Sequence, residues 1–196
     1  MTPSYNCLVA MMMGLLLIPS APAGTSLLKV DKNHSSIVFH VPILDGLSKV
    51  HGKFTDFDIN IKYDEADLAK SSVEATIKVA SIDTGIPDRD KDLRSPQFFD
   101  VDKYPSITFS SNHLEKRGDQ LVALGTLTMH GVSQEISLPI VITGKFKNSV
   151  GFAAKTTLNR RSYGMNWKHS AVSNFVGDDI EVEIELLTSI PIPKGE

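Results

Sequence analysis

The chain of 196 residues contains one cysteine, Cys7, and almost no segment with helical periodicity. A lone thiol excludes the disulfide framework on which many small exported proteins depend. The formal net charge is only −3, so there is no basic excess of the kind that a nucleic-acid partner requires. After residue 24 there is no second long apolar run, low-complexity linker or solenoid repeat. These absences favour one ordinary domain that is held together by its own core.

Motifs for catalysis and for metal binding are also missing. The sequence has no G-x-S-x-G nucleophile elbow, phosphate-binding loop or dinucleotide fingerprint. One Asp-Thr-Gly occurs at residues 83–85, but an aspartic protease needs a second carboxylate, so a strand-ending turn is the better interpretation. The six histidines lack the paired spacing of structural zinc sites. We therefore expect no enzyme, no metal site and no cofactor.

The first 23 residues have the pattern of a secretory signal peptide. An apolar run from Leu8 to Ile18 is followed by small residues that end at Ala23. This run is too short to cross a membrane, which takes roughly 20 apolar residues. We expect residues 1–23 to be removed by cleavage near Ala23, together with Cys7. Residues 24–196 should then form a single exported domain.

Alternation of apolar and polar residues dominates this domain, and such alternation is typical of strands with one buried face. Clear examples are SSIVFHV, DFDINIKY, SVEATIKVA and DIEVEIELL. The segments LVALGTLTM, EISLPIVI and GFAAKTTL are joined by short turns and should be antiparallel neighbours. About eight such strands with hardly any helix predict an all-β sandwich or closed barrel. The long pattern from Gln134 to about Lys147 favours the barrel, because tilted barrel strands are long.

A barrel of eight strands can be filled by its own side chains or can enclose one small ligand, and alternation alone leaves both open. In either case, strand parity selects the residues that should face the interior. They are Ile37, Phe39, Phe57, Ile59, Val73, Ile77, Phe109, Leu127, Met129, Ile140 and Phe152.

Residues 88–109, DRDKDLRSPQFFDVDKYPSITF, change abruptly from charged to aromatic. The spacing of Asp88, Asp90 and Asp92 matches the first ligands of an EF-hand loop. However, the positions that should hold Gly and Glu are Leu93 and Phe99. We therefore interpret the charged run as a solvated cluster whose charges nearly cancel.

The aromatic half of this segment predicts a lid. Ser95 and Pro96 have the residue types of an N-cap and a first helical position, which places a short helical turn near residues 88–100. Phe98, Phe99 and Tyr104 should then turn inward and close one end of the barrel.

Seven blocks together resemble the YceI-like family in order and spacing, over about residues 27–190. They are DKNHSSIVFHV, SKVHGKF, ASIDTG, RDKDLRSPQFFDVDKYPSITF, GTLTMHGVSQEISL, GFAAKTTLNRRSYGM and VGDDIEVEIEL. The resemblance implies an extended, eight-stranded, antiparallel, lipocalin-like barrel in the bacterial periplasm. It also implies an apolar cavity for a polyisoprenoid or similar amphiphile, and no catalytic activity. One departure is Asp92, because the family commonly has His at that position.

From this resemblance we expect a carrier of a long-chain isoprenoid lipid, either a quinone or a polyprenyl phosphate. Transient contact with a membrane or a membrane protein and a homodimer are both compatible with the sequence. The alternative is a barrel without cargo that serves in a stress response or binds another protein.

An anionic head group would need fixed cations at the barrel mouth, and Arg supplies the best donors. The candidates are Arg89, Arg160 and Arg161. The competing interpretation is structural: the neighbouring aspartates neutralise Arg89, and Arg160 ties two loops together.

Overall fold

A computed structural model describes residues 24–118 and 120–191, without the side chain of residue 112. The predicted signal peptide at residues 1–23 lies outside the described residues. The strands are β1 (Ser26–Val30), β2 (Ser36–Ile43), β3 (Ser48–Phe54), β4 (Phe57–Tyr63), β5 (Ser72–Lys78), β6 (Ile82–Asp83), β7 (Ser106–Arg117), β8 (Gln120–Met129), β9 (Val132–Phe146), β10 (Ser149–Asn159) and β11 (Asp179–Ser189). The helices are α1 (Pro87–Arg94) and the short 3₁₀ turns η1 (Lys32–His34), η2 (Leu68–Lys70), η3 (Val79–Ser81) and η4 (Arg160–Tyr163).

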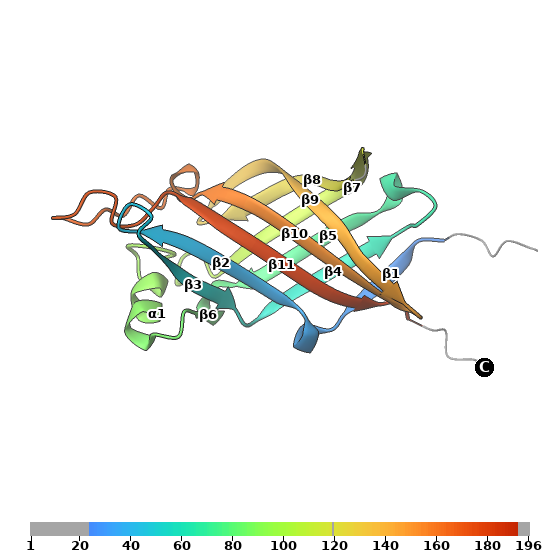
Figure 1. Cartoon of the computed structure of the whole chain (residues 1–196), viewed down its shortest axis with the longest axis horizontal. Coiled ribbons are helices and arrows are strands. Elements are labelled where there is room, and N and C mark those ends of the chain that lie inside the picture. Colours follow the sequence, from blue (N-terminus) through green and yellow to red (C-terminus); the bar gives the residue numbers. More distant parts are fainter. Residues whose placement is uncertain (1–23, 119, 192–196) are drawn as a thin grey trace, which may run out of the picture.

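Eight of these strands close an antiparallel barrel (Figure 1). Their order is β1-β4-β5-β7-β8-β9-β10-β11, and β1 closes the circle by pairing with the end of β11. After the turn η1 the chain continues as β2, which pairs with the first half of β11 and carries β3 and β6 beyond it. The prediction of an eight-stranded antiparallel barrel is confirmed, as is the neighbourhood of β8, β9 and β10.

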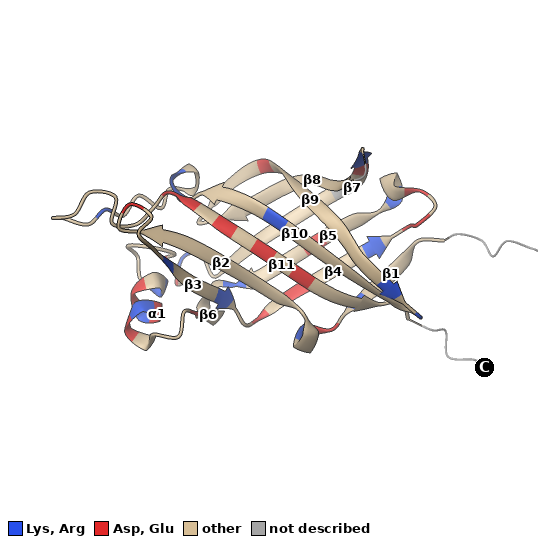
Figure 2. Ribbon diagram, viewed as in Figure 1, with Lys and Arg blue, Asp and Glu red and all other residues tan. Residues whose placement is uncertain are grey.

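The register explains why the strand sequences alternate. In the β10–β11 pair, Ala154 lies opposite Ile184 on the inner face, and Lys155 lies opposite Glu183 on the outer face. The outer pair forms an ion pair with an Nζ to Oε1 distance of 2.7 Å. The acidic positions recur along β11 beside the lysine of β10 (Figure 2). Exposed ion pairs of this kind contribute little stability, so the buried apolar face decides the register.

The helix near residues 88–100 exists, but it begins earlier than predicted. It spans Pro87–Arg94, with Pro87 in its first turn, and Ser95 is the C-cap instead of the N-cap. Acidic side chains occupy the first turn and basic ones the last, which suits the helix dipole. The charged run therefore forms the helix itself, and the aromatic residues follow it in a separate set of turns.

The Asp-Thr-Gly segment ends a strand, as predicted. The backbone N–H of Gly85 donates to Oδ1 of Asp83 at 2.9 Å, directly after β6. Gly85 has φ +76°, a left-handed conformation that glycine adopts without strain. This turn leads the chain from β6 into α1.

The two ends of the barrel differ in construction (Figure 1). One end carries α1, the turn at residues 44–47 between β2 and β3, and the loop at residues 164–178; we call it the mouth end. The other carries the start of β1, η2 and the β7–β8 and β9–β10 turns; we call it the closed end. Within the described residues, no helix is both long and apolar enough to span a membrane.

Candidate functional site

The barrel encloses a cavity of about 650 Å³. Its walls are the inward-facing side chains of β2–β5 and β7–β11. Several of these residues, including Val73, Ala75, Val182 and Ile184, are only half-buried although they point inward. Because packed cores leave few voids larger than a water molecule, such incomplete burial means that side chains do not fill the interior.

Apolar side chains seal the closed end. Leu28, Leu121, Ala123 and Val150 are at most 8% exposed, and none of them contacts the cavity. The floor of the cavity includes Tyr63, whose ring meets that of Phe152 edge-on at 6.0 Å between centroids. This end is packed like an ordinary protein core.

The cavity opens at the mouth end. Of the residues that line it, only Asp92 and Gln97 are exposed to solvent, and both belong to the α1 region. Phe98 and Trp167 line the cavity at this end, with ring centroids 5.2 Å apart and planes inclined by 32°. Apart from Tyr63 and the mid-wall Thr156, the polar lining groups are concentrated here, at Arg89, Asp92, Gln97 and Arg160.

Most of the predicted interior residues line the cavity. Those that do are Ile37, Phe39, Ile59, Val73, Ile77, Phe109, Leu127, Met129, Ile140 and Phe152. Phe57 does not: it is buried at the first position of β4 but lies outside the cavity wall. Strand parity predicts which face a residue occupies, but it does not predict how far along the strand the cavity extends.

The predicted lid is divided in the structure. Phe98 and Phe99 line the cavity, and the ring of Phe99 meets that of Phe54 edge-on at 6.2 Å. Tyr104, in contrast, does not line it. Its ring lies 4.5 Å from that of His130, so Tyr104 braces the β8–β9 turn instead.

Arg160 is 8% exposed, and its guanidinium is occupied by the loop at residues 164–178. Nε donates to the carbonyl of Gly177, Nη1 to those of Met165 and Trp167, and Nη2 to that of Val176, at 2.6–3.3 Å. Nη2 also forms an ion pair with Asp178 at 2.8 Å. Burial lowers the pKa of Arg160, and the charge of Asp178 opposes this effect. A guanidinium has five N–H donors, so none remains for a head group.

Arg161 and Arg89 differ from Arg160 and from each other. Arg161 does not line the cavity, and its side chain is 39% exposed in an ion pair with Asp178. Arg89 does line the cavity, and it donates from Nε to the hydroxyl and from Nη2 to the carbonyl of Thr84. Of the three predicted head-group residues, Arg89 therefore has the placement for that role. Arg160 instead has a structural role, although it holds one loop, residues 164–178, where the structural alternative had it tie two loops together.

The model of the YceI-like domain family matches residues 28–187, from the middle of β1 to near the end of β11, and so includes all or most of every strand of the barrel wall. The chain belongs to the YceI-like family. Among curated relatives, a UPF0312 protein of Photorhabdus laumondii is 36% identical over 74% of this chain and 76% of its own length. A UPF0312 protein of Pseudomonas putida is 34% identical over 89% of this chain and 94% of its own length.

Solved structures share the fold of this YceI-like barrel. The YceI protein of Campylobacter jejuni is 30% identical, with a TM-score of 0.65 over 74% of this chain and 88% of that one. BcnA of Burkholderia cenocepacia is 22% identical, with a TM-score of 0.75 over 81% and 99%. A polyisoprenoid-binding domain from Saccharophagus degradans is 15% identical, with a TM-score of 0.66 over 85% and 99%. The last two similarities concern the fold alone.

Sequence reasoning missed the part that the loop at residues 164–178 plays in the YceI-like cavity. This loop contributes Met165, Trp167, Phe175 and Val176 to the lining. It has no alternating pattern, so strand periodicity could not find it. The available signal was Trp167, the single tryptophan of the chain, close to other aromatic residues in an otherwise polar segment.

The histidines show one close pair on the outer surface of the barrel. His40 and His51 face each other across β2 and β3, with their Nδ1 atoms 2.6 Å apart. Nε2 of His40 lies 3.7 Å from Glu183 on β11. Across the described residues, no three His, Cys, Asp or Glu side chains converge in a way that could hold a metal ion.

Proposed function

We propose that this YceI-like protein is a periplasmic binding and carrier protein for a long-chain isoprenoid lipid, with a binding role and no catalytic one. The observation that carries the proposal is the cavity of about 650 Å³, whose walls are apolar and whose polar groups gather mainly at one open end. This arrangement suits an amphiphile with its chain inside and its head at the mouth. The polyisoprenoid-binding domain of Saccharophagus degradans has the same fold, which adds support.

The energetics favour a long apolar cargo. Each buried CH₂ contributes about 0.8 kcal/mol, so a few isoprene units can offset the entropy lost on capture. The walls offer few polar partners for any other kind of ligand. Affinity should therefore rise with chain length, and the unfilled interior supports a cargo carrier over a barrel with a solid core.

The charges at the mouth favour an uncharged head group. Arg89 is balanced by Asp92, which also lines the cavity, and the guanidinium of Arg160 is fully engaged by the loop. A pyrophosphate would therefore meet little net positive charge. The tilted rings of Phe98 and Trp167 offer a flat surface on which a ring can stack. We therefore favour an isoprenoid quinone over a polyprenyl phosphate.

The cargo can be tested by native mass spectrometry of protein purified from a periplasmic extract, followed by organic extraction. We expect a stoichiometric isoprenoid lipid in the wild type. Ile77→Trp and Leu127→Trp should lose it, because their side chains fill the cavity. The matched control is Val141→Trp, which enlarges a 53% exposed side chain beside the inward Ile140 and should keep its cargo. A wild type without lipid, or both inward variants with full occupancy, would refute the proposal.

The head group requires a separate comparison. The wild type should bind an isoprenoid quinone at least as tightly as a polyprenyl pyrophosphate of equal chain length in a calorimetric titration. Arg89→Gln should weaken the pyrophosphate more than the quinone. Much tighter binding of the pyrophosphate by the wild type would reverse the assignment and leave the carrier role intact.

The periplasmic location rests on the signal pattern in residues 1–23 and is tested by the mass of the mature protein. Expression of the full chain in a Gram-negative host should yield a periplasmic protein that begins at Gly24. Retention of the full-length chain in the cytoplasm would contradict this part of the proposal.

A further inference from the structure

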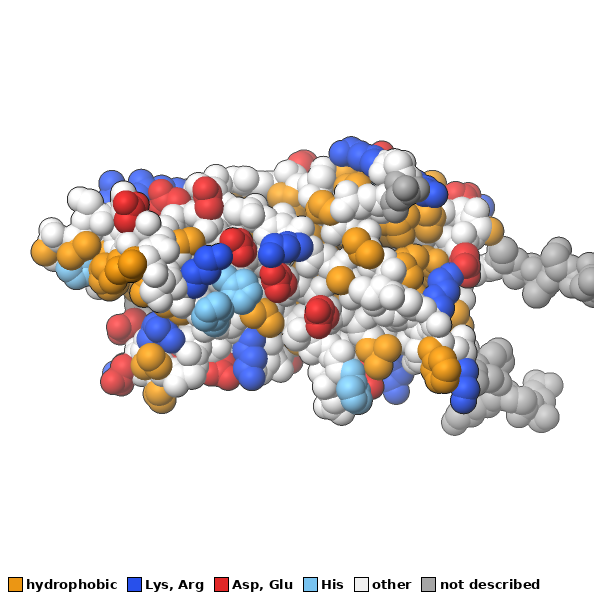
Figure 3. Space-filling view, viewed as in Figure 1, with side chains coloured by type: hydrophobic (Ala, Val, Ile, Leu, Met, Phe, Trp, Pro, Cys, Tyr) orange, Lys and Arg blue, Asp and Glu red, His pale blue; other side chains and the backbone are white. Residues whose placement is uncertain are grey.

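We propose that the mouth end docks directly on a lipid bilayer by inserting exposed aliphatic side chains of its rim. This inference rests on the proposed function, because it names the surface from which the barrel takes its cargo. The rim consists of the turn at residues 44–47 and the loop at residues 164–178. Figure 3 shows apolar side chains gathered at the end of the molecule that carries these segments.

The turn between β2 and β3 presents two leucines to solvent. Leu47 is 83% exposed and Leu44 is 41% exposed. Leu44 has φ 53°, in the left-handed region where Gly, Asn and Asp are the favoured residues. A leucine here gains little from burial and adopts an unfavourable backbone conformation. The fold itself therefore gives no reason for an apolar side chain at this position.

The loop at residues 164–178 adds Val172, which is 39% exposed, to the same rim. Backbone hydrogen bonds join the two segments: the N–H of Leu44 donates to Phe175 at 3.0 Å, and that of Gly177 donates to Pro42 at 2.8 Å. Arg160 in η4 holds the loop through hydrogen bonds to its backbone carbonyls. The two segments of the rim are therefore hydrogen-bonded to each other, and side chains of the loop also line the cavity.

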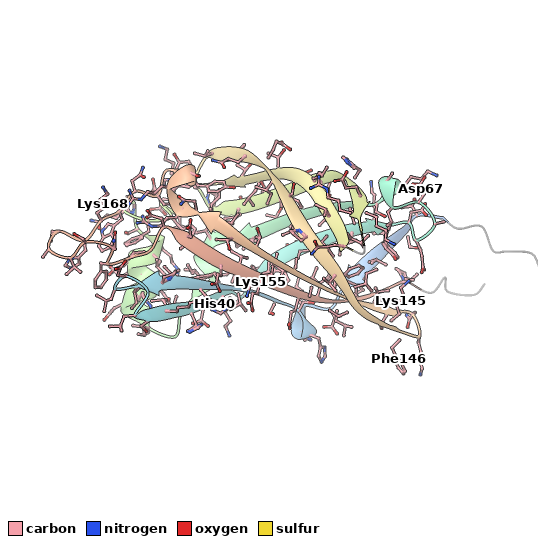
Figure 4. The ribbon with its side chains drawn as sticks, turned by 45° about the horizontal axis from the view of Figure 1, so that its top comes forward. His40, Asp67, Lys145, Phe146, Lys155 and Lys168 are labelled. Carbon is pink, nitrogen blue, oxygen red and sulfur yellow. The ribbon has the colours of Figure 1, made fainter. Side chains whose placement is uncertain are left out.

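The charges of the rim favour a neutral apolar surface as the partner. Residues 44–47 contain one charged side chain, Asp45, and residues 164–178 contain two, Lys168 and Asp178. Asp178 forms ion pairs with Arg160 and Arg161, which leaves Lys168 and Asp45 as the charges of the rim outside these pairs. Figure 4 places Lys168 on the loop at this end and Phe146 at the opposite end. An almost uncharged rim with protruding aliphatic side chains would insert into a bilayer without needing anionic lipids. A lipid leaving the bilayer would then enter the cavity without crossing water.

The closed end supplies the control. Phe146 is 74% exposed there, comparable to Leu47, but the cavity does not open beside it. If any exposed apolar side chain could bind vesicles, substitution of either residue would weaken vesicle binding equally. Docking at the mouth requires that only substitution of Leu47 weakens vesicle binding.

The experiment is flotation of the protein with vesicles of pure, neutral phosphatidylcholine. The wild type should float with the vesicles, and Leu47→Ser should weaken binding about tenfold, the loss expected for one inserted leucine. Phe146→Ser should bind like the wild type. No binding by the wild type, equal loss in both variants, or binding only to vesicles that contain membrane protein would overturn the inference.

Cargo uptake separates this inference from the proposed function. An isoprenoid quinone offered in detergent micelles should be taken up equally by the wild type and Leu47→Ser, whereas uptake from vesicles should be slower in the variant. Equal rates of uptake from vesicles would overturn docking while the carrier role stands. Leu47-dependent flotation without uptake from either source would support docking and refute the carrier role.

Discussion

The closed end and the mouth end of the barrel are built from the same alternating strands but are held together by different forces. At the closed end, apolar side chains such as Leu121 and Val150 are packed without a cavity between them. At the mouth end, the loop at residues 164–178 is held by hydrogen bonds from Arg160 to its backbone carbonyls and by backbone hydrogen bonds to the β2–β3 turn. Stability should therefore reside in the closed end, and ligand exchange should be controlled at the mouth.

This difference also explains how a barrel can contain a cavity and still fold. A cavity removes packing contacts from the side chains that line it, which lowers their contribution to stability. The solid closed end and the closed circle of hydrogen-bonded strands compensate for that loss. The mouth can then open locally without unfolding of the barrel.

The largest expected effect comes from truncating the same residue type in the two regions. Leu121→Ala, at the closed end, should lower the free energy of unfolding by about 2–5 kcal/mol, because it creates a new cavity in a packed core. Leu158→Ala, in the wall near the mouth, should cost only about 1 kcal/mol, because that half-buried side chain already faces a cavity. Urea denaturation of the lipid-free proteins measures both. Equal losses would show that the two regions do not differ in packing.

The next effect concerns the guanidinium that holds the mouth loop. Arg160→Gln should destabilise the protein by about 1–3 kcal/mol, because buried carbonyls lose their donors. It should also accelerate cargo release, since the loop is freed. Arg161→Gln is the matched control and should cost less than about 1 kcal/mol, because that arginine is exposed. Urea denaturation measures the loss of stability, and the rate of quinone release measures the freeing of the loop. If the two variants behaved identically, Arg160 would not hold the mouth loop more strongly than Arg161 does.

A smaller effect on stability, but a specific one on the rate of cargo exchange, is expected at the cavity mouth beside α1. Phe98→Ala removes the ring that packs on Trp167, so quinone exchange should become several-fold faster while the unfolding midpoint falls only slightly. Phe146→Ala removes an exposed aromatic ring at the closed end and should leave exchange unchanged. Stopped-flow exchange of the cargo tests the pair. If both variants exchange at the wild-type rate, Phe98 does not gate the mouth.

The fold was predictable from sequence because one face of each strand is buried, which forces alternation into the sequence. Phe39 and Ile184, for example, occupy the apolar positions of their alternating strands and face the interior. Phe57 shows the limit, because its parity is correct but it lies beyond the cavity. The cavity itself was not predictable from alternation, since a filled and an unfilled barrel have the same pattern.

The mouth was less predictable because its geometry depends on contacts that are distant in sequence. Ser95 and Pro96 have the residue types that begin a helix, but the helix begins at Pro87 and ends before Ser95. Arg160 holds carbonyls up to residue 177, and nothing local in the sequence marks these partners. In an irregular loop each backbone N–H and C=O finds its own hydrogen-bond partner, so these partners leave no periodic pattern in the sequence.

The smallest expected effect concerns Tyr163 in η4, just before the mouth loop. It is 2% exposed, and its hydroxyl has no hydrogen-bond partner among the described residues. Burial raises the pKa of this phenol above its ordinary value of about 10. Tyr163→Phe removes an unpaired buried hydroxyl and should therefore leave stability unchanged or raise it by up to about 1 kcal/mol.

The pH dependence of stability provides the sharper test of Tyr163. The pKa of this phenol is higher in the folded state than in the unfolded state. The group therefore lowers the stability of the fold once the pH is high enough for the unfolded state to ionise. Below about pH 10 both states are protonated and the pKa shift has no effect on the slope; as pH rises above that value, the unfolded state ionises first and the wild type loses stability. Tyr163→Phe lacks this group and should lose less stability between about pH 10 and 11 in parallel thermal melts, with the other tyrosines common to both proteins. A steeper loss in the variant, or a loss of more than about 1 kcal/mol at neutral pH, would show that the hydroxyl has a stabilising partner and that this part of the mouth end has no unpaired buried group.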